Sequence, residues 1–193
     1  MRHREHVAQL RRNLPAGPPV KDYVFPEGPA DLDAGDSPVR DVKLSELFSG
    51  PDRPLVVYHF MFGKKETSPC PMCTLWIDGY DGVAHHLKQN VDLVIVAAAE
   101  LPKLRAHARD RGWRHLRLLT AGDSTFKYDF VREDADGKQD SSVTVFSREA
   151  AGKVRHFYTG KPAMAEYLPG GCIDLHSPVR HIRGLPTKRR GDW

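Results

Sequence analysis

The chain has 193 residues, of which 40% are hydrophobic and 28% charged, a composition typical of a globular protein with one sizeable core. It contains neither an apolar run near the roughly 18 residues of a membrane-spanning helix nor the apolar stretch of a signal peptide, so we expect a cytoplasmic protein that contacts no membrane. The formal net charge of +4 is concentrated at the ends, where residues 1–12 carry +3 and residues 176–193 carry +4. The centre is therefore mildly acidic, which argues against nucleic-acid binding.

The first 50 residues predict little regular structure. A short helix is expected from His3 to Asn13, and residues 11–38 form an irregular arm because they are rich in Pro, Gly and Asp. The stretch "VRDVKLSELFSG" (39–50) then predicts a short strand and a turn of helix that ends at Gly50.

Three apolar runs predict buried strands of a parallel sheet: "RPLVVYHFMFG" (53–63), "VDLVIVAAA" (91–99) and "LRLLT" (116–120). Between the first two, apolar residues recur at three- and four-residue steps, which predicts a helix of about 17 residues. The members of this stripe are Cys73, Trp76, Tyr80, Val83 and Leu87.

The second half of the chain continues the alternation of strands and helices. "ELPKLRAHARDRGW" (100–113) predicts a helix that Gly112 caps, and "AGDSTFKYDF" (121–130) leads away from the third strand. "SVTVFSREAAGKVRHFYTG" (142–160) predicts two strands around a turn at Gly152.

This order of elements predicts an α/β fold of thioredoxin-like type, in which a mixed central sheet carries helices on both faces. We expect three parts: a helix and irregular arm at 1–38, the thioredoxin-like domain at 39–168, and a basic tail at 169–193.

The chemistry of the sequence is concentrated in "SPCPMC", which holds Cys70 and Cys73. A cysteine at a helix start is favoured as thiolate by unpaired N–H groups and the helix dipole, and Pro71 suits the first helical position. Lys64 and Lys65 are expected to add positive potential. Cys73 follows one turn later, so Cys70 is predicted to attack and Cys73 to resolve the mixed disulfide or sulfenic acid.

Other uses of the cysteines stay open at this point. Three cysteines are too few for a disulfide scaffold, and the pair can be incidental core residues. A zinc site would have to recruit Cys172 and scattered histidines, and covalent haem is excluded because Thr74, not histidine, follows Cys73. We therefore expect no metal and no other cofactor.

A peroxide-reducing enzyme is a further alternative. Thr67 lies three residues before Cys70, and peroxiredoxins are similar in placing Thr or Ser three residues before their reactive cysteine. Gly63 stands where they have proline, and Arg148 is a weak candidate for their activating arginine.

The chain as a whole resembles a known family. "LSELFSGPDRPLVVYHFMFG", "CPMC", "LPKLRAHARDRGW", "FKYDF" and "GCIDLHSPVRHIRGLPTKRRGDW" occur in order. They resemble a bacterial thioredoxin-like family of unknown function, grouped near the peroxiredoxin-type (alkyl hydroperoxide reductase/thiol-specific antioxidant) proteins. The resemblance implies a thioredoxin-like fold in a cytosolic bacterial protein and supplies no reaction.

Two departures from thioredoxins concern the site. Their Trp-Cys-Gly-Pro-Cys is replaced by Pro-Cys-Pro-Met-Cys, and no proline precedes "SVTVF", where Ser141 or Ser142 takes the place of the thioredoxin cis-proline. A general disulfide-reductase role is weakened, because that proline helps to hold a peptide substrate in thioredoxins.

Several other residues are candidates near the pair. His59 is interpreted as a core histidine or a proton relay, and Trp76 as a core residue that supports the pair. Asp123, Ser124, Tyr128 and Asp129 lie in a loop expected to approach the cysteines, since the carboxyl ends of parallel strands meet at one edge. Cys172 is interpreted as a buried thiol or a distant resolving cysteine.

The sequence thus predicts a thiol-disulfide oxidoreductase, with a peroxide-reducing enzyme or a non-catalytic thioredoxin-fold binding module as alternatives. The expected partners are a thiol, disulfide or peroxide substrate and a reducing protein or small thiol. We also expect a homodimer, and the arm and tail are expected either to cover the sheet edge or to embrace the second subunit.

Overall fold

The computed structural model describes residue 6 and residues 9–50 and 53–160. The predicted basic tail and Cys172 lie outside these residues, as does part of the predicted first helix, which is helical at residues 6 and 9–12. The boundaries of the three expected parts stay a prediction.

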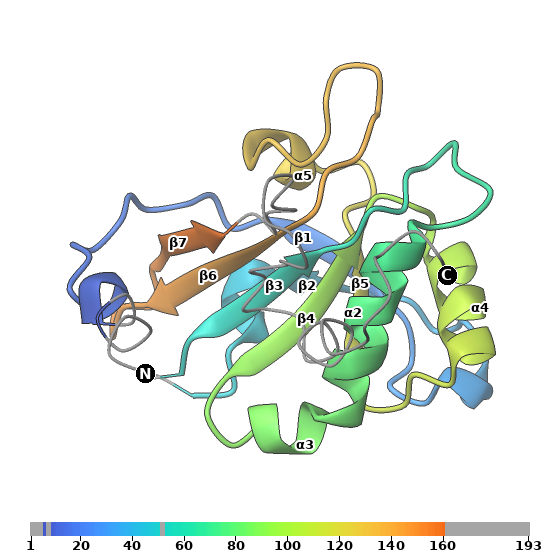
Figure 1. Cartoon of the computed structure of the whole chain (residues 1–193), viewed down its shortest axis with the longest axis horizontal. Coiled ribbons are helices and arrows are strands. Elements are labelled where there is room, and N and C mark those ends of the chain that lie inside the picture. Colours follow the sequence, from blue (N-terminus) through green and yellow to red (C-terminus); the bar gives the residue numbers. More distant parts are fainter. Residues whose placement is uncertain (1–5, 7–8, 51–52, 161–193) are drawn as a thin grey trace, which may run out of the picture.

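The core of the fold is one mixed sheet of seven strands in the order β2-β1-β5-β4-β3-β6-β7 (Figure 1). The β3–β4 and β4–β5 pairs are parallel, as predicted, and the outer pairs are antiparallel. The strands are β1 (Val24–Glu27), β2 (Arg40–Lys43), β3 (Leu55–His59), β4 (Asp92–Ala97), β5 (Arg117–Thr120), β6 (Ser142–Arg148) and β7 (Val154–Gly160).

The helices cover the two faces unequally. The helices are α2 (Pro71–Gly82), α3 (Ala84–Leu87), α4 (Leu101–Arg111) and α5 (Phe126–Asp129), with 3-10 turns η1 (Leu32–Ala34) and η2 (Leu44–Leu47). The longer helices α2 and α4 pack on one face, where Tyr58 and Ile95 of the central strands meet Trp76 and Leu104. The opposite face is covered by short elements, including η2 and α5.

Three expected elements differ from the structure. Residues 24–27 of the predicted irregular arm form β1, a strand of four residues that contains Pro26. The predicted helix of about 17 residues is broken at Val83 into α2 and α3, because Gly79 and Gly82 weaken its middle. The stretch after β5 contains the short helix α5. Gly112 caps α4 in the left-handed conformation, as predicted.

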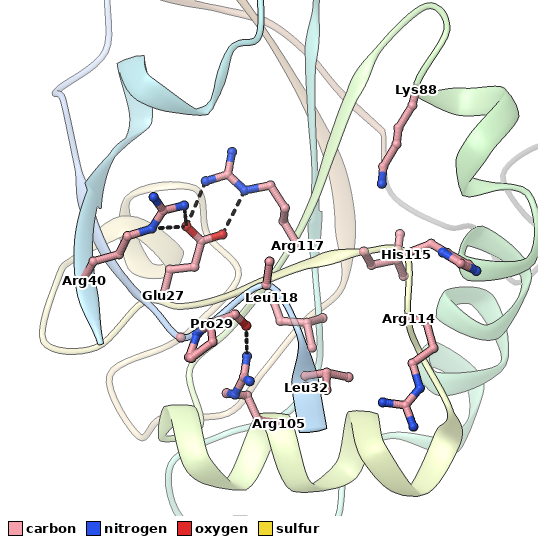
Figure 2. Close-up of a pocket in the computed structure, with 13 residues that line it drawn as sticks. Glu27, Pro29, Leu32, Arg40, Lys88, Arg105, Arg114, His115, Arg117 and Leu118 are labelled. Atoms are coloured by element: carbon pink, nitrogen blue, oxygen red, sulfur yellow. Dashed lines mark hydrogen bonds and ion pairs between the residues drawn. The ribbon is translucent and has the colours of Figure 1, made fainter. Parts of the chain in front are cut away.

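A buried carboxylate holds β1 against β5. In the register of these strands only Glu27 pairs, with Leu119, so side chains must strengthen the contact. Glu27 is 6% exposed and accepts hydrogen bonds from Arg117 at 2.8 and 2.9 Å and from Arg40 at 2.8 and 3.1 Å (Figure 2). Although burial opposes it, these two guanidinium groups hold the pKa of Glu27 below its ordinary value.

Arg105 of α4 similarly holds the segment 29–36 against this helix. Its buried guanidinium donates to the carbonyl oxygens of Pro29, Asp31 and Gly35 and to the Asp36 carboxylate. A cavity of about 280 Å³ lies between Arg105 and the Glu27 cluster (Figure 2). Its lining includes neither Cys70 nor Cys73, and Arg40, Arg105 and Arg117 are already bound within the protein.

We predict that Glu27→Gln lowers the free energy of unfolding by about 2–3 kcal/mol, because it leaves two arginines without their shared carboxylate. The partial exposure of both arginines keeps the loss toward the lower value. The Glu27 carboxylate stabilises the fold fully at pH values above its pKa in the unfolded chain. This stabilisation is lost as the pH falls through its lower pKa in the folded protein. Urea unfolding at pH 7 and at acidic pH measures both effects.

Asp136→Asn is the control, since Asp136 is exposed and its side chain makes no hydrogen bond among the described residues. Equal urea midpoints for Glu27→Gln and the wild type at pH 7 would contradict the conclusion that Glu27, with Arg40 and Arg117, stabilises the contact between β1 and β5.

Candidate active site

Cys70 is held at the point where the chain leaves β3 and enters α2. Its N–H donates to the Met61 carbonyl at 3.0 Å, and its carbonyl accepts the N–H of Thr74 at 3.0 Å as the first bond of the helix. Pro71 is the first residue of α2, where its missing N–H leaves no bond unmade. Cys70 is thus the N-cap residue, with the free N–H groups of the first turn beside its sulfur.

The two sulfurs form a hydrogen-bonded pair of unequal acidity. The Cys73 thiol donates to the half-buried Cys70 sulfur, and the N–H groups of Cys73 and Met72 also point to it. Together they lower the pKa of Cys70 to about 6, against the opposing effects of burial and of Glu66. Cys70 is therefore a thiolate at neutral pH.

Cys73 keeps its proton. It is 3% exposed, and the adjacent Cys70 thiolate, followed by burial, raises its pKa far above the ordinary thiol value. The Tyr58 hydroxyl and the Met61 N–H act in the opposite direction and lower the pKa of Cys73, because both favour its thiolate form. The geometry thus defines a half-buried nucleophile and a buried proton-bearing neighbour.

Tyr58 is a site residue that the sequence analysis missed. Its side chain is fully buried, with its ring 5.9 Å from that of Trp76 and 5.6 Å from that of Tyr80. Its hydroxyl has no hydrogen-bond partner among the described residues, and Cys73 is the ionisable group that acts on it most strongly. Burial, and then Cys73, raise the pKa of Tyr58 well above its ordinary value, so it remains a neutral donor.

Lys127 is the second residue that sequence reasoning missed. It belongs to α5, is 0% exposed, and donates from Nζ to the Phe60 carbonyl at 2.7 Å. No carboxylate lies within ion-pair distance of it in the described part of the chain. Burial lowers the pKa of Lys127 to about 8, and the charges of Glu133 and Cys73 oppose this shift.

The predicted supporting residues on the loop before Cys70 are not brought to its sulfur. Thr67 is exposed and makes no hydrogen bond to Cys70 in the described structure. Lys64 instead pairs with Asp123 at 3.4 Å, and both side chains are well exposed. Neither Lys64 nor Lys65 is among the main causes of the lowered pKa of Cys70, which are hydrogen bonds.

His59 and Trp76 lie on opposite faces of the sheet. His59 packs away from the cysteines, stacked on Phe126 at 5.2 Å, with Nε2 2.9 Å from the hydroxyl of Thr144. Burial lowers the pKa of His59 well below its ordinary value. It therefore fits the core interpretation. Trp76 packs in the cluster that contains Cys73, against Tyr58.

The remaining candidates divide between the two ends of the sheet. Ser142 pairs with His59 at the cysteine end, where the missing proline was noted. Arg148 lies at the far end of β6, where it donates to the Ser45 carbonyl, so it is not an activating arginine for Cys70. In α5, Tyr128 is exposed and Asp129 accepts a hydrogen bond from Tyr23.

Among the residues that the structure describes, no three His, Cys, Asp or Glu side chains are arranged to hold a metal ion. In the same part of the chain, no helix has the length and apolar character needed to cross a membrane.

We predict that Cys73→Ala raises the pKa of Cys70 by about one to two pH units, because the strongest hydrogen bond to the thiolate is lost and the backbone donors remain. The midpoint of the iodoacetamide alkylation rate against pH, in a Cys172→Ser background, measures it. Thr67→Val is the control and keeps the wild-type midpoint. A midpoint that stays near 6 in Cys73→Ala would assign the acidity to the helix start alone.

Solved structures with the same fold include peroxiredoxins. They include reduced Prx3 of Vibrio vulnificus in complex with H2O2 (16% identity, 80% of this chain and 92% of that chain, TM-score 0.55). A mitochondrial 2-Cys peroxiredoxin of Plasmodium falciparum (10%, 77% and 83%, TM-score 0.56) and a cysteine-to-serine mutant of PrxQ of Xylella fastidiosa (13%, 76% and 85%, TM-score 0.54) are similar as well.

The similarity to these structures confirms the predicted thioredoxin-like fold. No curated protein matches the sequence. The predicted family is confirmed, since residues 1–176 match the model of one family. The chain belongs to the family described as bacterial protein of unknown function (DUF899).

Proposed function

We propose that the protein is a thiol-disulfide oxidoreductase in which Cys70 attacks the substrate and Cys73 resolves the intermediate. One observation carries this proposal: Cys70 stands at the start of α2 with the buried Cys73 one helical turn along, and the Cys73 thiol is the main group that lowers the pKa of Cys70. The arrangement supplies a stabilised nucleophile and, within reach of it, a second thiol that is protected from solvent.

The reaction proceeds in two displacements. The Cys70 thiolate attacks one sulfur of a substrate disulfide, so that a mixed disulfide forms and the other substrate sulfur leaves as a thiolate. Cys73 then loses its proton to solvent and attacks the Cys70 sulfur, which releases the second substrate thiolate. The protein ends with a Cys70–Cys73 disulfide, and the substrate, now reduced, takes up two protons.

Peroxide is the second candidate oxidant, because the fold is that of peroxiredoxins and one of these is described in complex with H2O2. The Cys70 thiolate would attack one peroxide oxygen, forming a sulfenic acid as the O–O bond breaks and an alkoxide or hydroxide leaves. The Cys73 thiolate would then displace hydroxide and form the same disulfide. Against this candidate, neither Thr67 nor Arg148 is among the main groups that lower the pKa of Cys70, and Arg148 donates to the Ser45 carbonyl instead.

The test exposes reduced protein separately to a disulfide-bonded peptide and to hydrogen peroxide, and identifies the products by mass spectrometry of the cysteine peptides. We expect a Cys70–Cys73 disulfide after the peptide, no reaction of Cys70→Ser, and a stable mixed disulfide at Cys70 in Cys73→Ser. Cys172→Ser is the control and forms the same disulfide as the wild type.

The alternatives give different products. A sulfenic acid trapped in Cys73→Ser, formed at least about a thousandfold faster than the mixed disulfide, would assign the protein to peroxide reduction. If neither the peptide nor peroxide produces a Cys70–Cys73 disulfide, the proposal is overturned and the protein is a non-catalytic binding module.

The remaining predictions concern partners and location. Turnover needs a reducing protein or small thiol to return the disulfide to the dithiol, and we propose such a donor as the second substrate. The homodimer and the cytoplasmic location stay predictions that size measurements in solution and cell fractionation test.

A further inference from the structure

The peptide group between Phe60 and Met61 has an unusual position, because each of its polar ends contacts a functional side chain. Its carbonyl oxygen accepts the hydrogen bond from Lys127 Nζ at 2.7 Å. Its N–H, which belongs to Met61, lowers the pKa of Cys73 because it favours the thiolate form. One peptide thus connects a buried ammonium to the resolving thiol.

The burial of Lys127 is costly and calls for an explanation. An ammonium removed from water normally requires a paired charge, but within the described residues Lys127 donates its hydrogen bond to a carbonyl oxygen. The acidic groups whose charges act on Lys127 are Glu133, Cys73, Glu66 and Asp140, and His59 faces it from β3. Of these, Cys73 is the one that gains its charge during the proposed reaction.

We propose that Lys127 is a positioning residue for the second displacement: it polarises the Phe60–Met61 peptide, so that the Met61 N–H stabilises the Cys73 thiolate. Hydrogen bonds in a chain strengthen one another, most strongly when one end of the chain is charged. This inference rests on the proposed function, since it concerns the step in which Cys73 attacks.

The polarised peptide matters at one stage of the reaction only. In the reduced protein, the Cys70 thiolate keeps the proton on Cys73. Once Cys70 is in a mixed disulfide, that charge has gone and Cys73 must ionise in an apolar site. The groups that favour its thiolate there are the Tyr58 hydroxyl, the Met61 N–H and the charge of Lys127.

The experiment separates the two displacements with one reagent. Reduced protein in a Cys172→Ser background is mixed with 5,5′-dithiobis(2-nitrobenzoate) in a stopped-flow instrument over a range of pH. Attack by Cys70 releases one thionitrobenzoate in a phase that depends on reagent concentration. Attack by Cys73 on the mixed disulfide releases the second in a phase that does not.

We expect Lys127→Met to slow the second phase about tenfold at pH 7 and to raise its pH midpoint, because the Cys73 thiolate loses the polarised donor. Below the midpoint the variant is slower, and at high pH, where Cys73 is fully ionised, it reaches the wild-type rate. The first phase keeps its pH profile, since hydrogen bonds from Cys73 and the helix start set the acidity of Cys70.

Lys103→Met is the matched control. Lys103 is a half-buried lysine that donates to the Glu66 carbonyl, instead of to the Phe60 carbonyl, and lies over the Phe62 ring. We expect it to keep the wild-type midpoint of the second phase. Lys127→Gln keeps an uncharged N–H donor, should give an intermediate midpoint, and serves as the second variant if Lys127→Met does not fold.

The outcomes are distinguishable. A wild-type protein without a concentration-independent second phase contradicts the proposed function itself. A wild-type second phase whose midpoint is unchanged in both Lys127 variants overturns the role of Lys127 and leaves the proposed function standing. A shift in Lys103→Met as large as in Lys127→Met also overturns it, because the cause would then be general positive potential.

Discussion

The hydrogen bond between the Cys70 N–H and the Met61 carbonyl fixes the geometry of the whole site. It joins the start of α2 to residues 60–63, which are themselves held to the sheet, since Phe60 donates to Val96 and Phe62 accepts from the N–H groups after β4. The helix therefore begins at one defined place above the sheet. Cys73, one turn along, is brought onto Tyr58 and the Phe60–Met61 peptide.

Most of the fold could be predicted from the sequence because its central strands are buried on both faces. Such strands are continuous apolar runs, and the runs at 53–63, 91–99 and 116–120 correspond to β3, β4 and β5. β1 could not be predicted in the same way. Its four residues include Pro26 and an acidic residue, Glu27, whose burial depends on two arginines distant in sequence.

The burial of β3 on both faces also limited what could be predicted of the site. The helix start gave Cys70 and Pro71, because local sequence determines a helix cap. The choice between Tyr58 and His59 could not be made, since both are buried and no polar alternation marks the two faces. Only the packing of α2 on one face decides that Tyr58 meets Cys73. Lys127 was missed because lysine is normally exposed, and its burial depends on the contact of α5 with β3.

The proton of Cys73 has two opposed effects on the chemistry of the pair. While it stays, it stabilises the Cys70 thiolate, which favours the reduced protein and the first attack. The second attack requires that the same proton leave. A site optimised only for the first step would bury Cys73 among apolar groups and slow the second. The groups that favour the Cys73 thiolate, Tyr58 and the Met61 N–H, lie on β3 and its extension and are not among the main groups that lower the pKa of Cys70. Separate donor sets for the two sulfurs therefore allow both steps to proceed in a buried site.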